Sequence, residues 1–143
     1  MSDLVEYLII TAPDVDSLAT VADALAVLVK AGTIQLLDLV VVTRADDSTI
    51  GVLELEAVDS LAALREVEGE LGGLLSEHDL ELASFAIPPG SAGIVLVTED
   101  RWAEPLSVAA RHAGGLITAG ERIPASRVEA AMADRPGHPP GKA

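Results

Sequence analysis

Residues 6–44, EYLIITAPDVDSLATVADALAVLVKAGTIQLLDLVVVTR, decide the fold of this chain, because an amphipathic segment separates two apolar ones. Residues 6–11 combine β-branched and apolar side chains, which is typical of a strand. Within residues 18–29, apolar side chains recur three and four positions apart and predict a helix, which Gly32 ends. Residues 36–44 are apolar almost throughout, as in a strand covered on both faces. The stretch predicts a β-α-β unit with two parallel strands.

A second stretch has the same layout. Residues 92–98 (AGIVLVT) predict another buried strand, residues 102–113 carry apolar side chains at helical spacing, and residues 116–123 predict a further strand. We therefore expect two β-α-β repeats, at about 5–44 and about 92–123, packed side by side in a ferredoxin-like α+β sandwich.

The sequence between the two repeats predicts an insertion. Residues 49–58 alternate apolar and acidic side chains in their second half, which indicates a strand with one face in water. Helical spacing then returns in residues 60–71 and 74–85 and predicts an inserted helical hairpin. The expected organisation is a single α+β domain over residues 1–134, with repeat 1 at about 5–44, strand 3 and the helical insertion at 49–87, repeat 2 at about 92–123, a short C-terminal helix at 124–134 and a disordered tail at 135–143.

The expected sheet needs cover on both faces. A single layer of helices covers one face, so the middle helix or a second subunit must cover the other. An uncovered aliphatic sheet face would exceed the apolar patches that monomers normally expose. We therefore expect a homodimer or a larger closed homo-oligomer.

Charge is distributed unevenly along the 143 residues, whose formal net charge is −14. Residues 1–98 carry 17 acidic and 3 basic residues, whereas residues 99–143 carry 6 of each. A nucleic-acid-binding surface is excluded, because phosphate contacts need clustered Lys and Arg. The acidic part is interpreted as a solvated surface, or as a surface that attracts a basic protein partner or cations.

Several chemistries need residues that this sequence does not supply. There is no Cys, which excludes disulfides, thiolate catalysis and Cys-ligated zinc. His78, His112 and His138 fall in separate segments, without the spacing of metal ligands. The sequence favours a non-enzyme, and predicts no catalytic residue, no metal ligand and no cofactor.

The sequence has no segment typical of membrane insertion or secretion. Its start, MSDLVEY, is acidic and lacks the basic and apolar regions of a secretory signal. The longest uncharged run, residues 82–98, contains Pro88-Pro89-Gly90, and a spanning helix needs about 20 apolar residues. We expect a cytoplasmic protein without a membrane span.

The string Ser76-Glu77-His78-Asp79 contains the residue types of a hydrolytic triad. Triad partners normally come from separate segments, and adjacent residues on one helical turn point in different directions. We therefore interpret the string as the start of a helix, with Ser76 as its cap.

Acidic residues of the middle segment raise the question of a cation site. Glu54 and Glu56 are expected to share one face of the predicted strand at 49–58, and Asp59 follows. No calcium-loop pattern is present, so a solvated acidic face is the favoured interpretation.

Four side chains are candidates for binding a small ligand in an apolar pocket: Tyr7, Trp102, His112 and Arg122. Ligand pockets combine aliphatic walls with a few convergent polar groups, and these residues supply such groups.

Eight short strings occur along the chain in one order: VEYLII at 5–10, AGTIQLLDLV at 31–40, LEL at 53–55, GGLLSEHD at 72–79, PGSA at 89–92, WA at 102–103, AGG at 113–115 and ERIP at 121–124. In these strings the chain resembles an actinobacterial domain-of-unknown-function family, DUF6325, over about residues 5–134. A broader family with the same β-α-β pattern is often labelled membrane- or stress-associated, and the acidic middle segment argues against the membrane label here. The resemblance implies the fold and, through the broader family, a stress-associated role. It carries over no functional residue.

Three hypotheses about function follow from the sequence. The first is a non-enzymatic α+β module that acts through self-association or protein–protein contact. The second is a small-ligand sensor with an apolar pocket between sheet and helices or at a dimer interface. The third is an enzyme of the dimeric α+β-barrel type.

Overall fold

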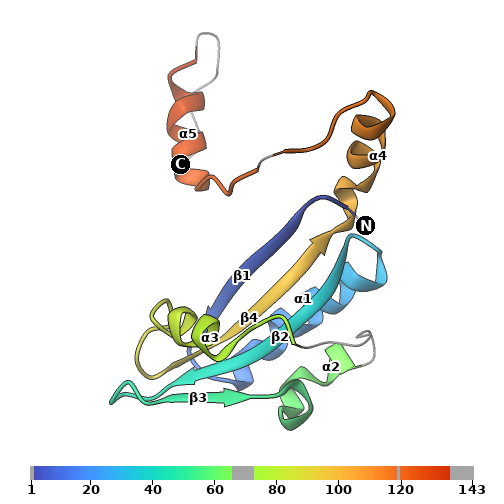
Figure 1. Cartoon of the computed structure of the whole chain (residues 1–143). Coiled ribbons are helices and arrows are strands. Elements are labelled where there is room, and N and C mark those ends of the chain that lie inside the picture. The colour runs from blue at the N-terminus through green and yellow to red at the C-terminus, as the bar shows by residue number, and fades with distance from the viewer. Residues whose placement is uncertain (1, 66–72, 119, 136–143) are drawn as a thin grey trace.

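A computed structural model of the chain describes residues 2–65, 73–118 and 120–135 (Figure 1). It is an α+β fold, which confirms the class predicted from the sequence. One antiparallel sheet has the strand order β1-β4-β2-β3. The strands are β1 (Val5–Ala12), β2 (Ile34–Arg44), β3 (Ile50–Leu53) and β4 (Ser91–Asp100).

The helices are α1 (Ala19–Lys30), α2 (Ala62–Arg65), α3 (Glu77–Ser84), α4 (Glu104–His112) and α5 (Ala125–Ala133). Single 3-10 turns lie at Asp16–Leu18, Leu55–Ala57, Asp59–Leu61 and Arg101–Ala103. Gly32, predicted to end the first helix, has a φ of 73°, which favours glycine, and its N–H donates to the carbonyl of Val29 at 3.0 Å.

β1, α1 and β2 form the first predicted unit. β4 lies between β1 and β2 and is antiparallel to both, so β1 and β2 are parallel to each other. The unit is therefore a split β-α-β motif, in which a strand from the later part of the chain separates the two parallel strands.

Alternate residues of the strands face two separate apolar cores, as the two-residue period of a strand requires. In β2, Leu39 and Val41 contact α1 and the 55–64 segment, whereas Val40 and Val42 contact α3. Both faces of the central strands are thus covered within one chain. The sequence left open whether the middle helix or a second subunit covers the second face, and α3 covers its central part.

The predicted helical hairpin at 60–71 and 74–85 is wrong. Leu64 of α2 belongs to the core on the α1 side, whereas Leu80 and Ala83 of α3 belong to the core on the other face. The two helices therefore lie against opposite faces of the sheet. The end of the first predicted helix, from residue 66, lies outside the described residues.

The predicted strand at 49–58 ends early, at Leu53. Leu55 and Val58 turn into the core on the α1 side instead of continuing the alternation. The guanidinium of Arg65 holds this turn, because Nη2 donates to the carbonyls of Leu55, Glu56 and Val58 at 3.3, 2.7 and 3.0 Å.

The predicted strand at 116–123 is also wrong, and the second β-α-β repeat does not form. Residues 116–118 and 120–123 have no regular secondary structure and pair with no strand. A crossover helix returns the chain to the sheet by packing on it, but α4 buries only Ser107 and continues past the end of β4 (Figure 1). The ferredoxin-like arrangement of two repeats is therefore not confirmed.

The last described part of the chain adds no strand to the sheet. We call residues 116–118 and 120–135 the C-terminal arm. It runs outward from α4 and ends in α5, which contains no buried residue (Figure 1).

Candidate functional site

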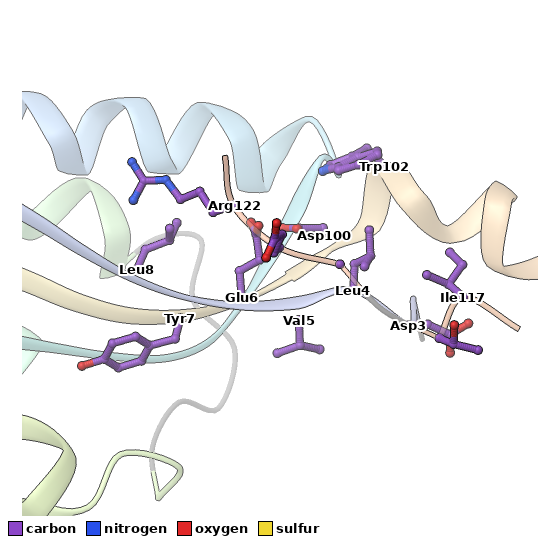
Figure 2. Close-up of a pocket in the computed structure, with 13 residues that line it drawn as sticks. Asp3, Leu4, Val5, Glu6, Tyr7, Leu8, Asp100, Trp102, Ile117 and Arg122 are labelled. Carbon is purple, nitrogen blue, oxygen red and sulfur yellow. The ribbon is translucent and has the colours of Figure 1, made fainter. Parts of the chain in front are cut away.

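A pocket with a volume of about 660 Å³ lies along the free edge of β1 (Figure 2). β1 pairs with β4 on one side, so its other edge carries unpaired backbone groups. The C-terminal arm runs past this edge without pairing with it. The lining residues are Asp3, Leu4, Val5, Glu6, Tyr7, Leu8, Asp100, Trp102, Ile117, Thr118, Gly120, Glu121 and Arg122.

Three of the four predicted ligand-binding residues line this pocket: Tyr7 from β1, Trp102 from the turn before α4, and Arg122 from the arm. The fourth, His112, lies elsewhere, at the end of α4 beside Val108 and Arg111. Residues far apart in the sequence therefore meet here.

The two faces of β1 give the pocket two kinds of lining. Figure 2 shows Val5 and Tyr7 on one side of the strand and Glu6 and Leu8 on the other. The pocket therefore wraps around the strand edge, with the Tyr7 ring on the α3 side and the Glu6 carboxylate on the α1 side.

Glu6 and Asp100 form a carboxyl pair that sequence reasoning missed. Glu6 lies opposite Thr98 in the sheet register, so Asp100 is its diagonal neighbour on the same face. Asp100 is only 4% exposed. Burial, a hydrogen bond with the Glu6 side chain and the Glu6 charge raise the pKa of Asp100 to about 6. The pair can therefore take up or release a proton in mildly acidic solution.

The start of the chain lines the pocket with Asp3 and Leu4. Hydrogen bonds and an ion pair join residues 2–4 to β4 and α4. The N–H of Ser2 donates to the buried Glu99 carboxylate at 2.7 Å, and the N–H of Asp100 donates to the carbonyl of Leu4 at 2.8 Å. Arg111 Nη2 lies 2.7 Å from Asp3 Oδ1 in a partly exposed ion pair. These contacts fix the position of Glu6 and Tyr7 relative to the base of α4.

The string 76–79 is the start of a helix, as predicted. The N–H of Asp79 donates to Ser76 Oγ at 3.1 Å, and the N–H of Ser76 donates to Asp79 Oδ2 at 2.9 Å, which is a capping box. The hydrogen bonds from Ser76 lower the pKa of Asp79, so this carboxyl is ionised at neutral pH.

The predicted acidic strand face does not form. Since β3 ends at Leu53, Glu54 precedes a 3-10 turn and Glu56 lies within it, so the two share no strand face. Within residues 2–65, 73–118 and 120–135, no group of three or more His, Asp or Glu side chains is arranged to hold a metal ion.

Asp38 is a buried acidic residue with a structural role. It lies at a bulge in β2 and is 3% exposed. Its Oδ1 accepts the N–H of Leu39 at 2.9 Å, and its Oδ2 accepts those of Leu74 and Leu75 at 3.0 and 2.8 Å. Asp38 therefore anchors the loop that leads into α3, and the apolar run of residues 36–44 gave no sign of this contact.

None of the helices that the structure describes is long and apolar enough to cross a membrane.

Comparison with curated proteins and with solved structures finds no match. A family model, described as a family of unknown function (DUF6325), matches residues 3–135, which confirms the resemblance seen in the sequence. The match covers nearly all of the chain, including β1, β4 and the C-terminal arm that together form the pocket. The chain therefore belongs to the DUF6325 family.

Proposed function

We propose that this protein is a non-enzymatic α+β module that acts through self-association or contact with another protein. The observation that carries the proposal is the C-terminal arm, in which Leu116, Ile123, Val128 and Met132 are exposed and no residue of α5 is buried. Ordering a helix has an entropic cost that an isolated helix of nine residues does not recover in water. Packing of its apolar side against a protein surface would supply the missing stabilisation.

The distribution of charge supports the same proposal. The first 98 residues carry 17 acidic and 3 basic side chains, whereas the rest of the chain is balanced. A basic protein partner and a second copy of the chain, through its arginine-bearing arm, are both compatible with this acidic surface.

Analytical ultracentrifugation of the purified protein tests self-association. We expect an average mass above the 14.7 kDa of one chain, rising with protein concentration towards twice that value. A mass of one chain at every concentration would exclude self-association and leave contact with a different protein as the remaining form of the proposal. Affinity purification from the source cells tests that form.

The pocket at the β1 edge favours a second function, binding of a small organic cation. Asp3, Glu6, Asp100 and Glu121 line it against a single guanidinium, from Arg122, and Tyr7 and Trp102 are its aromatic lining residues. Aromatic faces and carboxylates together attract such ligands.

Trp102 is the only Trp of the chain, so its fluorescence reports on this pocket directly. A set of organic amines is titrated against the protein, with the carboxylic acids of the same carbon skeletons as controls. Saturable quenching by amines alone supports a cation site, and Glu6→Gln is expected to weaken it several-fold. An unchanged emission spectrum with every amine would argue against this second function.

The third hypothesis, a dimeric α+β-barrel enzyme, needed a His or Tyr inside a closed cavity. His78 and His112 are exposed and Tyr7 lies in an open pocket, so nothing in residues 2–65, 73–118 and 120–135 favours it.

A further inference from the structure

A second hollow lies on the α3 side of the sheet, between α3 and β1. Its volume is about 310 Å³, and it is lined by Tyr7, Ile9, Asp79, Leu82 and Ala83. α3 covers Val40, Val42 and Val95 of the central strands, but it leaves this side of β1 open. We call this hollow the α3–β1 groove.

The surroundings of the α3–β1 groove are apolar and exposed. Val5, Tyr7 and Leu82 are each about half exposed, and Phe85, three residues after Leu82 and therefore on the same flank of the helix, is 70% exposed. Tyr7, the single Tyr of the chain, lines the groove, and Phe85, its single Phe, is exposed at the end of α3. Such a cluster is larger than scattered surface residues and marks an interaction site.

The charge next to the α3–β1 groove is acidic. α3 carries Glu77, Asp79 and Glu81 and no Lys or Arg. Asp79 itself lines the groove, and β1 presents no charged residue on this face, since its one charged residue, Glu6, lies on the α1 side. A binding partner should therefore present an apolar strip with positive charge beside it.

α5 has these two properties. Ile123, Val128, Ala131 and Met132 form an apolar strip on one side of the arm, and Arg127 and Arg135 border that strip. α5 has nine residues and α3 has eight, so both helices are about 12–14 Å long. In Figure 1 α5 lies clear of α3 and of the sheet, so the arm of one chain leaves its strip free for another.

We propose that α5 of a second copy of this chain docks in the α3–β1 groove, with its apolar strip against Tyr7, Ile9 and Leu82 and its arginines towards Asp79. Because each chain has one groove and one arm, two chains exchange their arms and form a closed two-fold dimer. This inference rests on the proposed self-association and names the surface that mediates it. Exchange also accounts for the position of α5, which lies clear of α3 and of the sheet of its own chain (Figure 1).

Disulfide trapping tests the docking, because the chain has no Cys of its own. Leu82→Cys chains are mixed with Met132→Cys chains and oxidised mildly. We expect a cross-linked product of two chains, since the proposal places these two exposed side chains next to each other across the interface. The matched control replaces Leu82→Cys by Val27→Cys, whose side chain is 65% exposed on α1, and should give little of this product.

A variant with both Cys residues in one chain tests the alternative in which the arm folds back on its own groove. The proposal predicts linked pairs of chains. A disulfide formed within single chains in dilute solution would overturn the exchange, and so would the absence of any link between positions 82 and 132.

Sedimentation shows whether the proposed docking is wrong or whether the proposed self-association itself is wrong. Val128→Asp places a charge in the apolar strip and should shift dimers to single chains, whereas Ala130→Asp, on the opposite side of α5, should not. Both side chains are exposed, so folding should not be affected, which circular dichroism checks. A wild-type dimer that Val128→Asp leaves unchanged would overturn the docking but keep self-association, and a wild-type single chain would overturn both.

Discussion

At the scale of single residues, Asp100 shows how the sheet register creates a titrating group. Its pKa is raised to about 6 because burial and the Glu6 carboxyl both disfavour its charged form. The folded protein therefore holds a proton that the unfolded chain releases at the ordinary Asp pKa of 3.8. The proton held on Asp100 therefore stabilises the folded protein fully below that ordinary pKa, and this stabilisation is lost as the pH rises through about 6.

We expect Asp100→Asn to remove this contribution to the pH dependence. An amide stays neutral at every pH, so at neutral pH the variant should be more stable than the wild type by about 1–2 kcal/mol, allowing for solvent screening in the open pocket. Urea unfolding at a series of pH values between about 4 and 7 measures the difference. Asp23→Asn, on the exposed side of α1, is the control. A variant whose stability follows that of the wild type at a constant offset would contradict the prediction.

Asp38 is a residue whose loss should destabilise the whole fold. Its carboxylate accepts three backbone N–H groups at the bulge of β2. Asp38→Ala leaves these donors without their partner, and we expect a loss of about 3 kcal/mol in the free energy of unfolding. Asp38→Asn keeps one acceptor oxygen and should lose less. Thermal and urea unfolding measure both, with Asp23→Ala as control, and an Asp38→Ala variant as stable as that control would refute the role of Asp38.

At the scale of elements, local pattern predicted α1, β2 and β4 because their packing agrees with their periodicity. Leu18, Ala22 and Leu25 follow helical spacing and are buried in α1, and the apolar run of β2 faces a core on each side. The prediction of a strand at residues 116–123 failed because a strand also needs a neighbouring strand to pair with, and the sequence of the segment does not reveal that pairing. The chain after α4 passes the free edge of β1 and lines a pocket with it, but residues 116–118 and 120–123 pair with no strand.

The start of α3 offers a test at this scale. Ser76→Ala removes the oxygen that accepts the N–H of Asp79, and we expect a loss of about 1 kcal/mol in stability. Ser76→Asp supplies another acceptor and should lose much less. Urea unfolding compares the two variants, and equal losses would mean that the cap adds nothing to the fold.

At the scale of the whole molecule, the sequence predicted part of the pocket and missed its chemistry. Tyr7, Trp102 and Arg122 were predicted as polar groups of a ligand pocket, and they line one pocket. Glu6 and Asp100 were not selected, because their contact depends on which residue of β1 lies opposite which residue of β4. Periodicity predicts that a strand forms, but it does not predict the register between two strands whose paired residues lie 80 to 94 positions apart.

The uneven charge of the molecule predicts how the proposed dimer responds to salt. Arginines of the arm face an acidic groove, so added salt should weaken association several-fold by screening this attraction. A chain with Arg127→Gln and Arg135→Gln should associate more weakly at low salt and show little further dependence. Sedimentation at low and high ionic strength measures both proteins. Association that strengthens with salt would point to purely apolar docking.

The split β-α-β motif has a consequence for synthesis of the protein. β1 and β2 do not pair with each other, and both depend on β4, which ends only at Asp100. While the chain leaves the ribosome, its first two strands have no hydrogen-bonding neighbour other than the short β3, and the sheet closes only after β4 has emerged. Pairings this distant in sequence form slowly. The nascent chain therefore carries two long apolar segments in an unpaired state, and its yield in the cell should depend on protection by chaperones during that interval.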